Sequence, residues 1–127
     1  MKSIADIADQ RKHMRFRAKE GAFAVLMNHV TRVGPIKDIS RGGLAFTYIS
    51  EDKLSQGSFM VDLLFGGEGF YLKDIPSKVI TDFEAIDQPS FSLIPLRRCS
   101  VQFEEMNPLQ ISQLESFTRN YTIQVKR

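Results

Sequence analysis

Apolar and polar residues alternate along much of the chain with the two-residue period of β-strands. Val61, Leu63 and Phe65, for example, fall on one face of a strand and the residues between them on the other. Segments of this kind, rich in Val, Ile, Phe and Thr, cover residues 23–30, 33–39, 44–49, 58–65, 75–84 and 91–104. We predict that each is a strand that offers one face to a common core.

Turn-forming residues separate these segments. Gly42-Gly43, the glycines of residues 66–69 and Pro89 all lie between predicted strands, where glycine allows the positive φ that tight turns need. No helical pattern interrupts the series, so a parallel sheet with crossover helices is excluded. The pattern predicts an all-β fold, a six-stranded antiparallel β-barrel of the split-barrel type, in which closure hides the sheet edges.

The last part of the chain changes to a helical period. Asn107 is followed by Pro108, and Gln110 stands at the capping-box position. Apolar side chains at 111, 114, 117 and 121 then share one face. We predict a C-terminal α-helix over residues 107–123 that packs on the barrel or on a partner.

Length and composition are those of one globular domain. A chain of 127 residues with 43% hydrophobic residues buries about two-thirds of its unfolded surface without a metal or disulfide. We predict one domain over residues 1–127, with a flexible N-terminal arm (1–20), a barrel (21–105) and the helix. Cys99 is the one cysteine, the longest apolar run (22–27) is too short for a membrane span, and no secretory signal is evident, so we expect a cytoplasmic protein.

The net charge of +2 conceals a segregation of charge. Residues 1–41 sum to +5, residues 42–96 to −5 and residues 97–127 to +2. The cationic side chains are densest at 11–19, where no carboxylate intervenes: Arg11, Lys12, Arg15, Arg17 and Lys19. This distribution indicates an anionic partner for the N-terminal end.

The residues that most enzyme mechanisms need are not arranged for catalysis. His13, His29 and Cys99 make no zinc-binding pattern, and no serine has the context of a nucleophile. Asp82 and Glu84 would share one face of a strand, which we interpret as a solvated face rather than as an acid and base pair. We expect no enzyme, no metal and no cofactor.

One candidate binding motif is an RxxxR pattern. Two guanidiniums, those of Arg11 and Arg15 with Lys12 and Arg17 beside them, could close on a phosphate or on the edge of a purine. The spacing alone favours the alternative, a solvated run of charge.

A second candidate motif is DxSxxG at the end of a predicted strand. Asp38 and Ser40 would project together, and a carboxylate can accept both donors on the edge of guanine while Gly42 and Gly43 let a flat ring approach the backbone. In the alternative, Asp38 and Ser40 only open a turn through bonds to the backbone. The motif by itself leaves both possibilities open.

The two motifs in this order, followed by the later strands and a terminal helix, resemble the PilZ domain family from Arg11 to about Tyr121. Residues 72–82 and 98–103 are similar to that family's later strands. The resemblance implies a barrel that binds the bacterial second messenger cyclic di-GMP and then changes its contacts with another domain or protein. It implies a ligand site made of Arg11, Lys12, Arg15, Asp38, Ser40, Gly42 and Gly43.

In that site, Arg11 and Arg15 would hold phosphates and guanine faces, and the carboxylate motif would meet guanine. Two positions depart from the family pattern: Lys12 stands where many relatives have a second arginine, and Ser100 where glycine is usual. The first departure weakens stacking on a base, and the second reshapes the floor of the site. We expect the arm to order on binding and an unidentified downstream protein to receive the signal.

Two other functions compete with the receptor. The first is a PilZ-like protein-interaction module that binds no nucleotide and uses the barrel as a scaffold. The presence of Arg11, Arg15, Asp38 and Ser40 disfavours it. A small-barrel nucleic-acid binder would need aromatic and basic residues interleaved on exposed strands. Most of the phenylalanines are instead in phase with core positions, which disfavours nucleic acid as a partner. A hydrolase of the messenger is disfavoured, because the sequence has no pattern of metal-binding residues.

Overall fold

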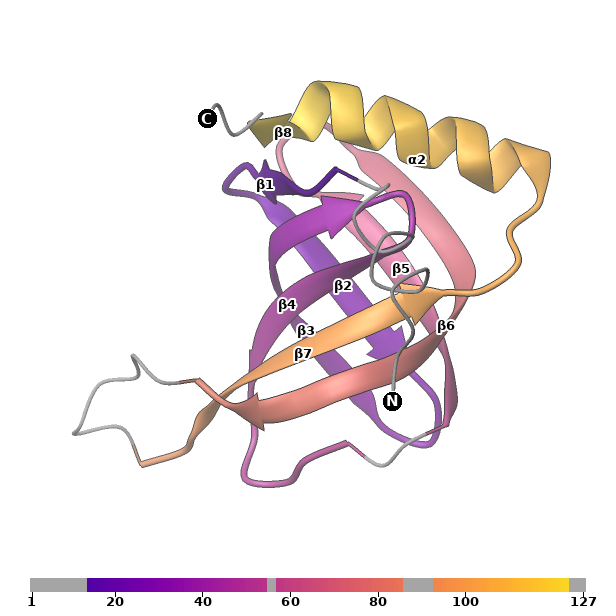
Figure 1. Cartoon of the computed structure of the whole chain (residues 1–127). Coiled ribbons are helices and arrows are strands. Elements are labelled where there is room, and N and C mark those ends of the chain that lie inside the picture. Colours follow the sequence, from indigo (N-terminus) through magenta and orange to yellow (C-terminus); the bar gives the residue numbers. More distant parts are fainter. Residues whose placement is uncertain (1–13, 55–56, 86–92, 124–127) are drawn as a thin grey trace.

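The computed structural model of the chain describes residues 14–54, 57–85 and 93–123 (Figure 1). Within these ranges the backbone forms a series of strands followed by one helix and a last short strand. In chain order they are β1 (Phe16–Ala18), β2 (Ala22–Met27), β3 (Thr31–Ser40), β4 (Gly43–Ile49), β5 (Ser58–Phe65), β6 (Phe70–Glu84), β7 (Leu96–Phe103), α2 (Pro108–Tyr121) and β8 (Thr122–Ile123).

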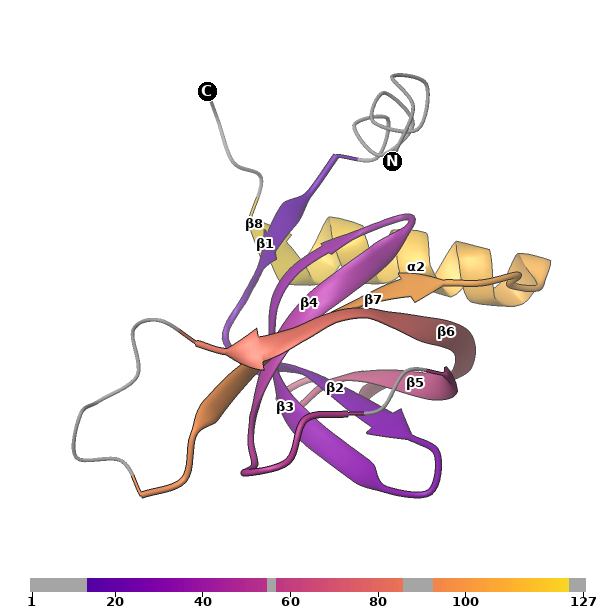
Figure 2. The ribbon, with the colours of Figure 1, turned by 60° about the horizontal axis from the view of Figure 1, so that its bottom comes forward.

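Six of these strands close into an antiparallel barrel. They are hydrogen-bonded in the order β2-β5-β6-β7-β4-β3, and the pairing of β2 with β3 completes the ring (Figures 1 and 2). The short strand β1 adds to β3 outside the ring, and β8 adds to β1. The predicted six-stranded all-β barrel with a C-terminal helix is therefore confirmed.

The interior of the barrel follows from the two-residue period. Along β2, buried side chains alternate with partly exposed ones, and β7 shows the same alternation. The inward side chains form one cluster, whose largest fully buried members include Phe46, Leu26, Ile39, Leu63 and Ile75. This continuous apolar core stabilises the fold without a disulfide.

The helix α2 lies across one end of the barrel (Figure 1) and contributes to the same core. Leu114 and Phe117 are buried, as the helical period predicted. Tyr121 stacks on Phe65 with ring centroids 4.2 Å apart and meets Phe70 edge to face. The helix ends at Tyr121, before the predicted end at 123, because Thr122 is extended and enters β8.

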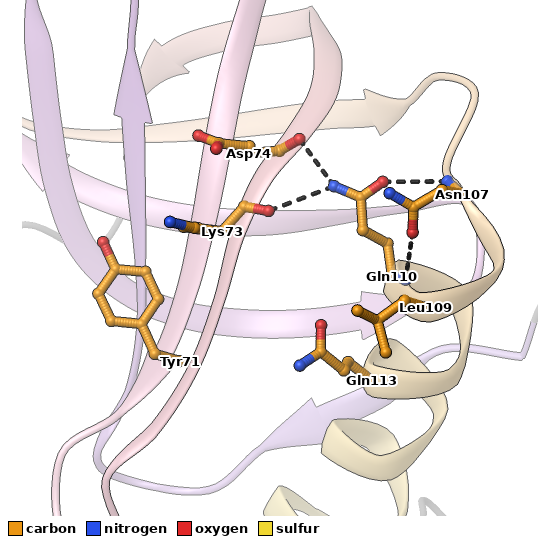
Figure 3. A pocket seen from close by; sticks show the side chains of 7 residues that line it. All are labelled: Tyr71, Lys73, Asp74, Asn107, Leu109, Gln110 and Gln113. Carbon is orange, nitrogen blue, oxygen red and sulfur yellow. Dashed lines mark hydrogen bonds between the residues drawn. The ribbon is translucent and has the colours of Figure 1, made fainter.

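The start of α2 is fixed by the predicted capping box. The Asn107 side chain accepts from the Gln110 backbone N–H (2.7 Å), and Gln110 Oε1 accepts from the Asn107 N–H (3.1 Å). Gln110 Nε2 also donates to the carbonyls of Lys73 and Asp74 on β6, at 3.2 and 2.8 Å (Figure 3). One side chain therefore both caps the helix and attaches it to the barrel.

Several predicted strands differ from the structure at their ends: the strand expected over 23–30 is 22–27, and that expected over 91–104 is 96–103. The strand expected from residue 75 begins at Phe70, because the glycine turn after Phe65 pairs these two residues directly. Gly69 in this turn has a φ of 71°, as a glycine-dependent turn requires. In the expected arm of residues 1–20, Phe16–Ala18 form β1 and so lie within the sheet.

The expectation that Asp82 lies on a solvated strand face is wrong. Its side chain is 3% exposed and accepts from Arg97 Nε at 2.7 Å, from the Leu54 backbone N–H at 2.7 Å and from the Tyr48 hydroxyl. A bulge after Val79 shifts the pairing of β6 with β7 and turns the carboxylate inward. Asp82 is therefore the centre of a buried polar network at one end of the barrel.

No helix within 14–54, 57–85 or 93–123 has the length and apolar character that a membrane crossing needs.

Candidate functional site

The two sequence motifs meet at Asp38. The Arg15 Nη1 atom lies 2.6 Å from Asp38 Oδ1, and Arg98 Nη2 lies 3.1 Å from Asp38 Oδ2. The three side chains come from the segment before β1, from β3 and from β7. One carboxylate thus joins two guanidiniums that are distant in the chain.

The sheet determines this meeting. Strand β1 pairs with β3 so that Arg17 stands opposite Asp38, which brings the preceding Arg15 to the same region. On the other side of β3, a bulge between Ile36 and Asp38 shifts the pairing with β4. The Asp38 side chain is 23% exposed, against 63% for Arg15 and 36% for Arg98, so it is partly screened from solvent and open to a ligand.

A groove of about 710 Å³ opens beside this cluster, between β1, the turn that follows it and β3. Its lining includes five cationic side chains and two carboxylates: Arg15, Arg17, Lys19, Lys37, Arg98, Glu20 and Asp38. The excess of positive charge suits an anionic ligand, and the planar arginine forks suit phosphate.

The serine of the second motif has a different environment. Ser40 is buried, and its hydroxyl accepts from the Gly42 backbone N–H at 3.1 Å. The Gly42 carbonyl in turn accepts from the Phe103 N–H on β7 at 2.8 Å. Ser40 therefore shapes the turn between β3 and β4, which was the alternative interpretation of this residue.

The glycine at the start of β4 is required by packing. A Cβ atom on Gly43 would lie 2.1 Å from the Val101 carbonyl oxygen on β7. No side chain can be accommodated there without moving a backbone that is hydrogen-bonded in the sheet. The close approach that the sequence suggested for a ligand is made, in this structure, by the neighbouring strand.

The structure brings Arg15 and Asp38 together and places Ser40, Gly42 and Gly43 in the turn that follows. Arg11 and Lys12 lie outside the described residues. Arg98 was not predicted as a site residue. Its signal in the sequence is the pair Arg97-Arg98 within a strand, because alternation directs one of two adjacent residues outward.

A second hollow, also of about 710 Å³, lies at the N-terminal end of α2 (Figure 3) and contains none of the predicted site residues. At its edge the Tyr71 hydroxyl donates to Asp62 at 2.6 Å, and this bond raises the pKa of Tyr71. Among the described residues, no cluster of three His, Cys, Asp or Glu side chains could hold a metal ion.

Comparison with known proteins gives a family match. The family model described as the PilZ domain matches residues 9–120. A comparison with curated proteins finds no match.

Two solved structures are similar in fold. The PilZ domain of YcgR from Escherichia coli, determined with c-di-GMP, superposes with a TM-score of 0.67 at 20% identity, over 87% of this chain and 92% of that one. The MrkH–c-di-GMP complex of K. pneumonia gives 0.61 at 20% identity, over 87% of this chain and 51% of that one. This chain thus spans nearly all of the YcgR domain and about half of MrkH.

Proposed function

The chain belongs to the PilZ domain family, and from this premise we propose that it is a receptor for cyclic di-GMP and not an enzyme. The observation that carries the proposal is the contact between the two motifs: Arg15 and Asp38 lie 2.6 Å apart at a cationic groove. The relatives named above were determined with the same ligand.

The chemistry of the two side chains fits the two parts of such a ligand. Guanine presents two N–H donors on one edge, and the two oxygens of Asp38 can accept both. The Arg15 fork suits a phosphate of the dinucleotide. Because Arg15 and Asp38 neutralise each other in the described structure, we infer that the ligand separates them and satisfies each one.

The remaining predicted residues have supporting roles in this proposal. The turn that ends β3 is stabilised by Ser40, Gly42 and Gly43, and this turn helps to fix the position of Asp38 in the strand before it. Arg11 and Lys12 would add charge from the segment before β1. Each residue of that segment that binding fixes would cost roughly 1–2 kcal/mol of conformational entropy. Charge-assisted hydrogen bonds of roughly 1.5–3 kcal/mol each offset this cost.

We further propose that helix α2 carries the signal to a downstream protein. The motif turn contacts it directly, since Arg41, between Ser40 and Gly42, lies 3.7 Å from Glu115. The arginine segment contacts it through β1: the Lys19 backbone N–H donates to the Tyr121 carbonyl at 2.9 Å, and Lys19 Nζ donates to the Asn120 carbonyl at 3.3 Å. The motif turn and the segment around β1 therefore both contact α2.

We also propose that the protein is located in the reducing cytoplasm. Cys99 is buried in the core, and burial raises the pKa of its thiol to about 12. A thiol of this kind has little thiolate at neutral pH and takes part in packing rather than in chemistry.

Isothermal titration calorimetry with cyclic di-GMP tests the receptor function. We expect saturable binding by the wild type and losses of at least tenfold in Arg15→Ala and Asp38→Ala, since each removes a charge-assisted contact of roughly 1.5–3 kcal/mol. Lys53→Ala, which removes an exposed charge outside the groove, is the matched control.

GMP and single-stranded RNA serve as competing ligands. No heat from the wild type at tens of micromolar cyclic di-GMP would leave the interaction module as the better function. Tighter binding of RNA than of the dinucleotide would favour the nucleic-acid binder. Wild-type binding that survives Arg15→Ala would show that the site lies elsewhere.

A further inference from the structure

We propose that Arg98 is a positioning residue for guanine recognition: it holds the Asp38 carboxylate in place when Arg15 leaves it for the ligand. The inference rests on the proposed receptor function and adds a residue that neither motif contains. It starts from the fact that Asp38 has one guanidinium on each oxygen, Arg15 on Oδ1 and Arg98 on Oδ2.

The two arginines are anchored very differently. Arg98 lies within β7, a strand of eight residues that pairs with β4 on one side and β6 on the other. Arg15 precedes β1, a strand of three residues outside the barrel ring, whose neighbours are β3 and the two-residue strand β8. The side chain of Arg15 is 63% exposed and that of Arg98 is 36% exposed. Arg15 is therefore the partner that can move, and Arg98 the one that stays.

Arg98 forms an ion pair with Asp38. Its neighbours across the sheet are Thr47 on β4 and Phe83 on β6, and neither is charged. The ion pair of Arg98 with Asp38 crosses 60 residues of sequence. Since the adjacent Arg97 turns inward to Asp82, the outward direction of Arg98 follows from strand alternation.

The carboxylate needs such a support. When Arg15 shifts to a phosphate, Oδ1 loses its donor and the side chain of Asp38 becomes freer to rotate. A bond from Arg98 to Oδ2 prevents that rotation. It leaves lone pairs on both oxygens for the two donors of guanine, because each carboxylate oxygen can accept twice.

The role of Arg98 has a distinctive consequence for selectivity. Cyclic di-IMP is the same dinucleotide without the guanine 2-amino groups, so it forfeits one of the two bonds to Asp38. The wild type should therefore prefer cyclic di-GMP to cyclic di-IMP by roughly tenfold, the equivalent of about one charge-assisted hydrogen bond. A protein in which Asp38 is badly placed should lose most of this preference.

The experiment measures both ligands by calorimetry against the wild type, Arg98→Gln, Arg98→Lys and the charge-matched control Lys53→Gln. We expect Arg98→Gln to bind cyclic di-GMP roughly tenfold more weakly and cyclic di-IMP only two- to threefold more weakly. Arg98→Lys keeps the charge without the planar fork, so it should lose selectivity as well. Lys53→Gln should behave as the wild type does.

Asp38→Ala supplies the reference for lost guanine recognition, and its ratio between the two ligands should fall near that of Arg98→Gln. An equal loss for both ligands in Arg98→Gln would assign Arg98 to a phosphate and overturn the positioning role. Unchanged selectivity in both Arg98 variants would overturn it too. Absence of binding by the wild type would refute the receptor function itself, a different result from a variant that binds like the wild type.

Discussion

Arg97 and Arg98 are adjacent on β7 and bind aspartates on opposite sides of the barrel wall. Arg97 Nε lies 2.7 Å from Asp82 Oδ1, in a pair whose side chains are 8% and 3% exposed. Arg98 lies 3.1 Å from Asp38, in the more exposed pair that borders the groove. Strand alternation has thus given the same residue type two roles, one in the fold and one at the candidate site.

The buried pair should dominate the stability of the fold. Arg97→Gln leaves the buried carboxylate of Asp82 without its cation, and we expect the free energy of unfolding to fall by about 3–5 kcal/mol. Arg98→Gln, at the partly exposed pair, should cost at most about 1 kcal/mol. Urea denaturation followed by circular dichroism measures both. Equal losses in the two variants would contradict the division of roles.

Gly43 should be intolerant of substitution for a reason independent of any ligand. Gly43→Ala places a methyl group 2.1 Å from the Val101 carbonyl oxygen, so the pairing of β4 with β7 must shift. We expect a loss of about 2–4 kcal/mol of unfolding free energy, in the range of other severe steric changes. Gly67→Ala is the control, since its added Cβ meets no atom within 4 Å and its φ is not positive. A Gly43→Ala protein of unaltered stability would argue against this close contact.

Tyr48 should make the unfolding free energy depend on alkaline pH. Burial raises the pKa of Tyr48 well above its ordinary value, and the bond to Asp82 raises it further. In the unfolded chain a tyrosine ionises near pH 10. The contribution of Tyr48 to the free energy of unfolding is therefore complete below pH 10, and it decreases by up to about 1.4 kcal/mol per pH unit above pH 10. Tyr48→Phe should lose about 2 kcal/mol at neutral pH. It should show a shallower decline above pH 10.

Urea denaturation of both proteins between pH 8 and 11.5 checks this prediction. The Cys99 thiol, whose pKa burial raises to about 12, adds a decline of the same sign above its ordinary value of 9.0. Because both proteins contain Cys99, their difference isolates Tyr48. Parallel curves for the two proteins above pH 10 would count against an unionised Tyr48 in the folded state.

The contact between Arg41 and Glu115 should transmit ligand binding to α2. Glu115→Gln removes an exposed ion pair, so we expect a stability change below about 1 kcal/mol. In hydrogen exchange, cyclic di-GMP should alter the protection of α2 in the wild type, and Glu115→Gln should reduce that response by about half, with the contacts of Lys19 still in place. Glu105→Gln is the control with the same change of charge. An undiminished response would exclude this route.

Much of the fold could be predicted from the sequence because its signals are local. The two-residue period located the barrel strands, and the Asn107 and Gln110 capping box located the start of α2. The bulge after Val79 was not predictable, because it depends on how β6 pairs with β7 and not on the sequence of β6 alone. It was this bulge that turned Asp82 inward. Strand β1 was missed for a related reason, since three residues carry little periodicity.

The candidate site was predictable only in part. Motif spacing identified Arg15 and Asp38, whose contact is a product of the pairing of β1 with β3. Arg98 lies 60 residues from Asp38, and only the sheet order that places β7, β4 and β3 side by side explains their contact. For Ser40, the sequence offered two roles: its hydroxyl accepts from the Gly42 N–H in the turn, and its contact with a ligand stays a prediction.

Strand β1 lies between β3 and β8, so the first and last strands of the described residues are hydrogen-bonded neighbours, and β1 lines the groove. The chain therefore enters β1 and leaves β8 at neighbouring points, and a small shift of β1 would change the angle between them. Fluorescent proteins fused to the two ends of the full chain, which keeps Arg11 and Lys12, should change their energy transfer when the groove is filled. The arrangement of strands that joins the candidate site to α2 thus also makes this protein suitable for building an optical sensor.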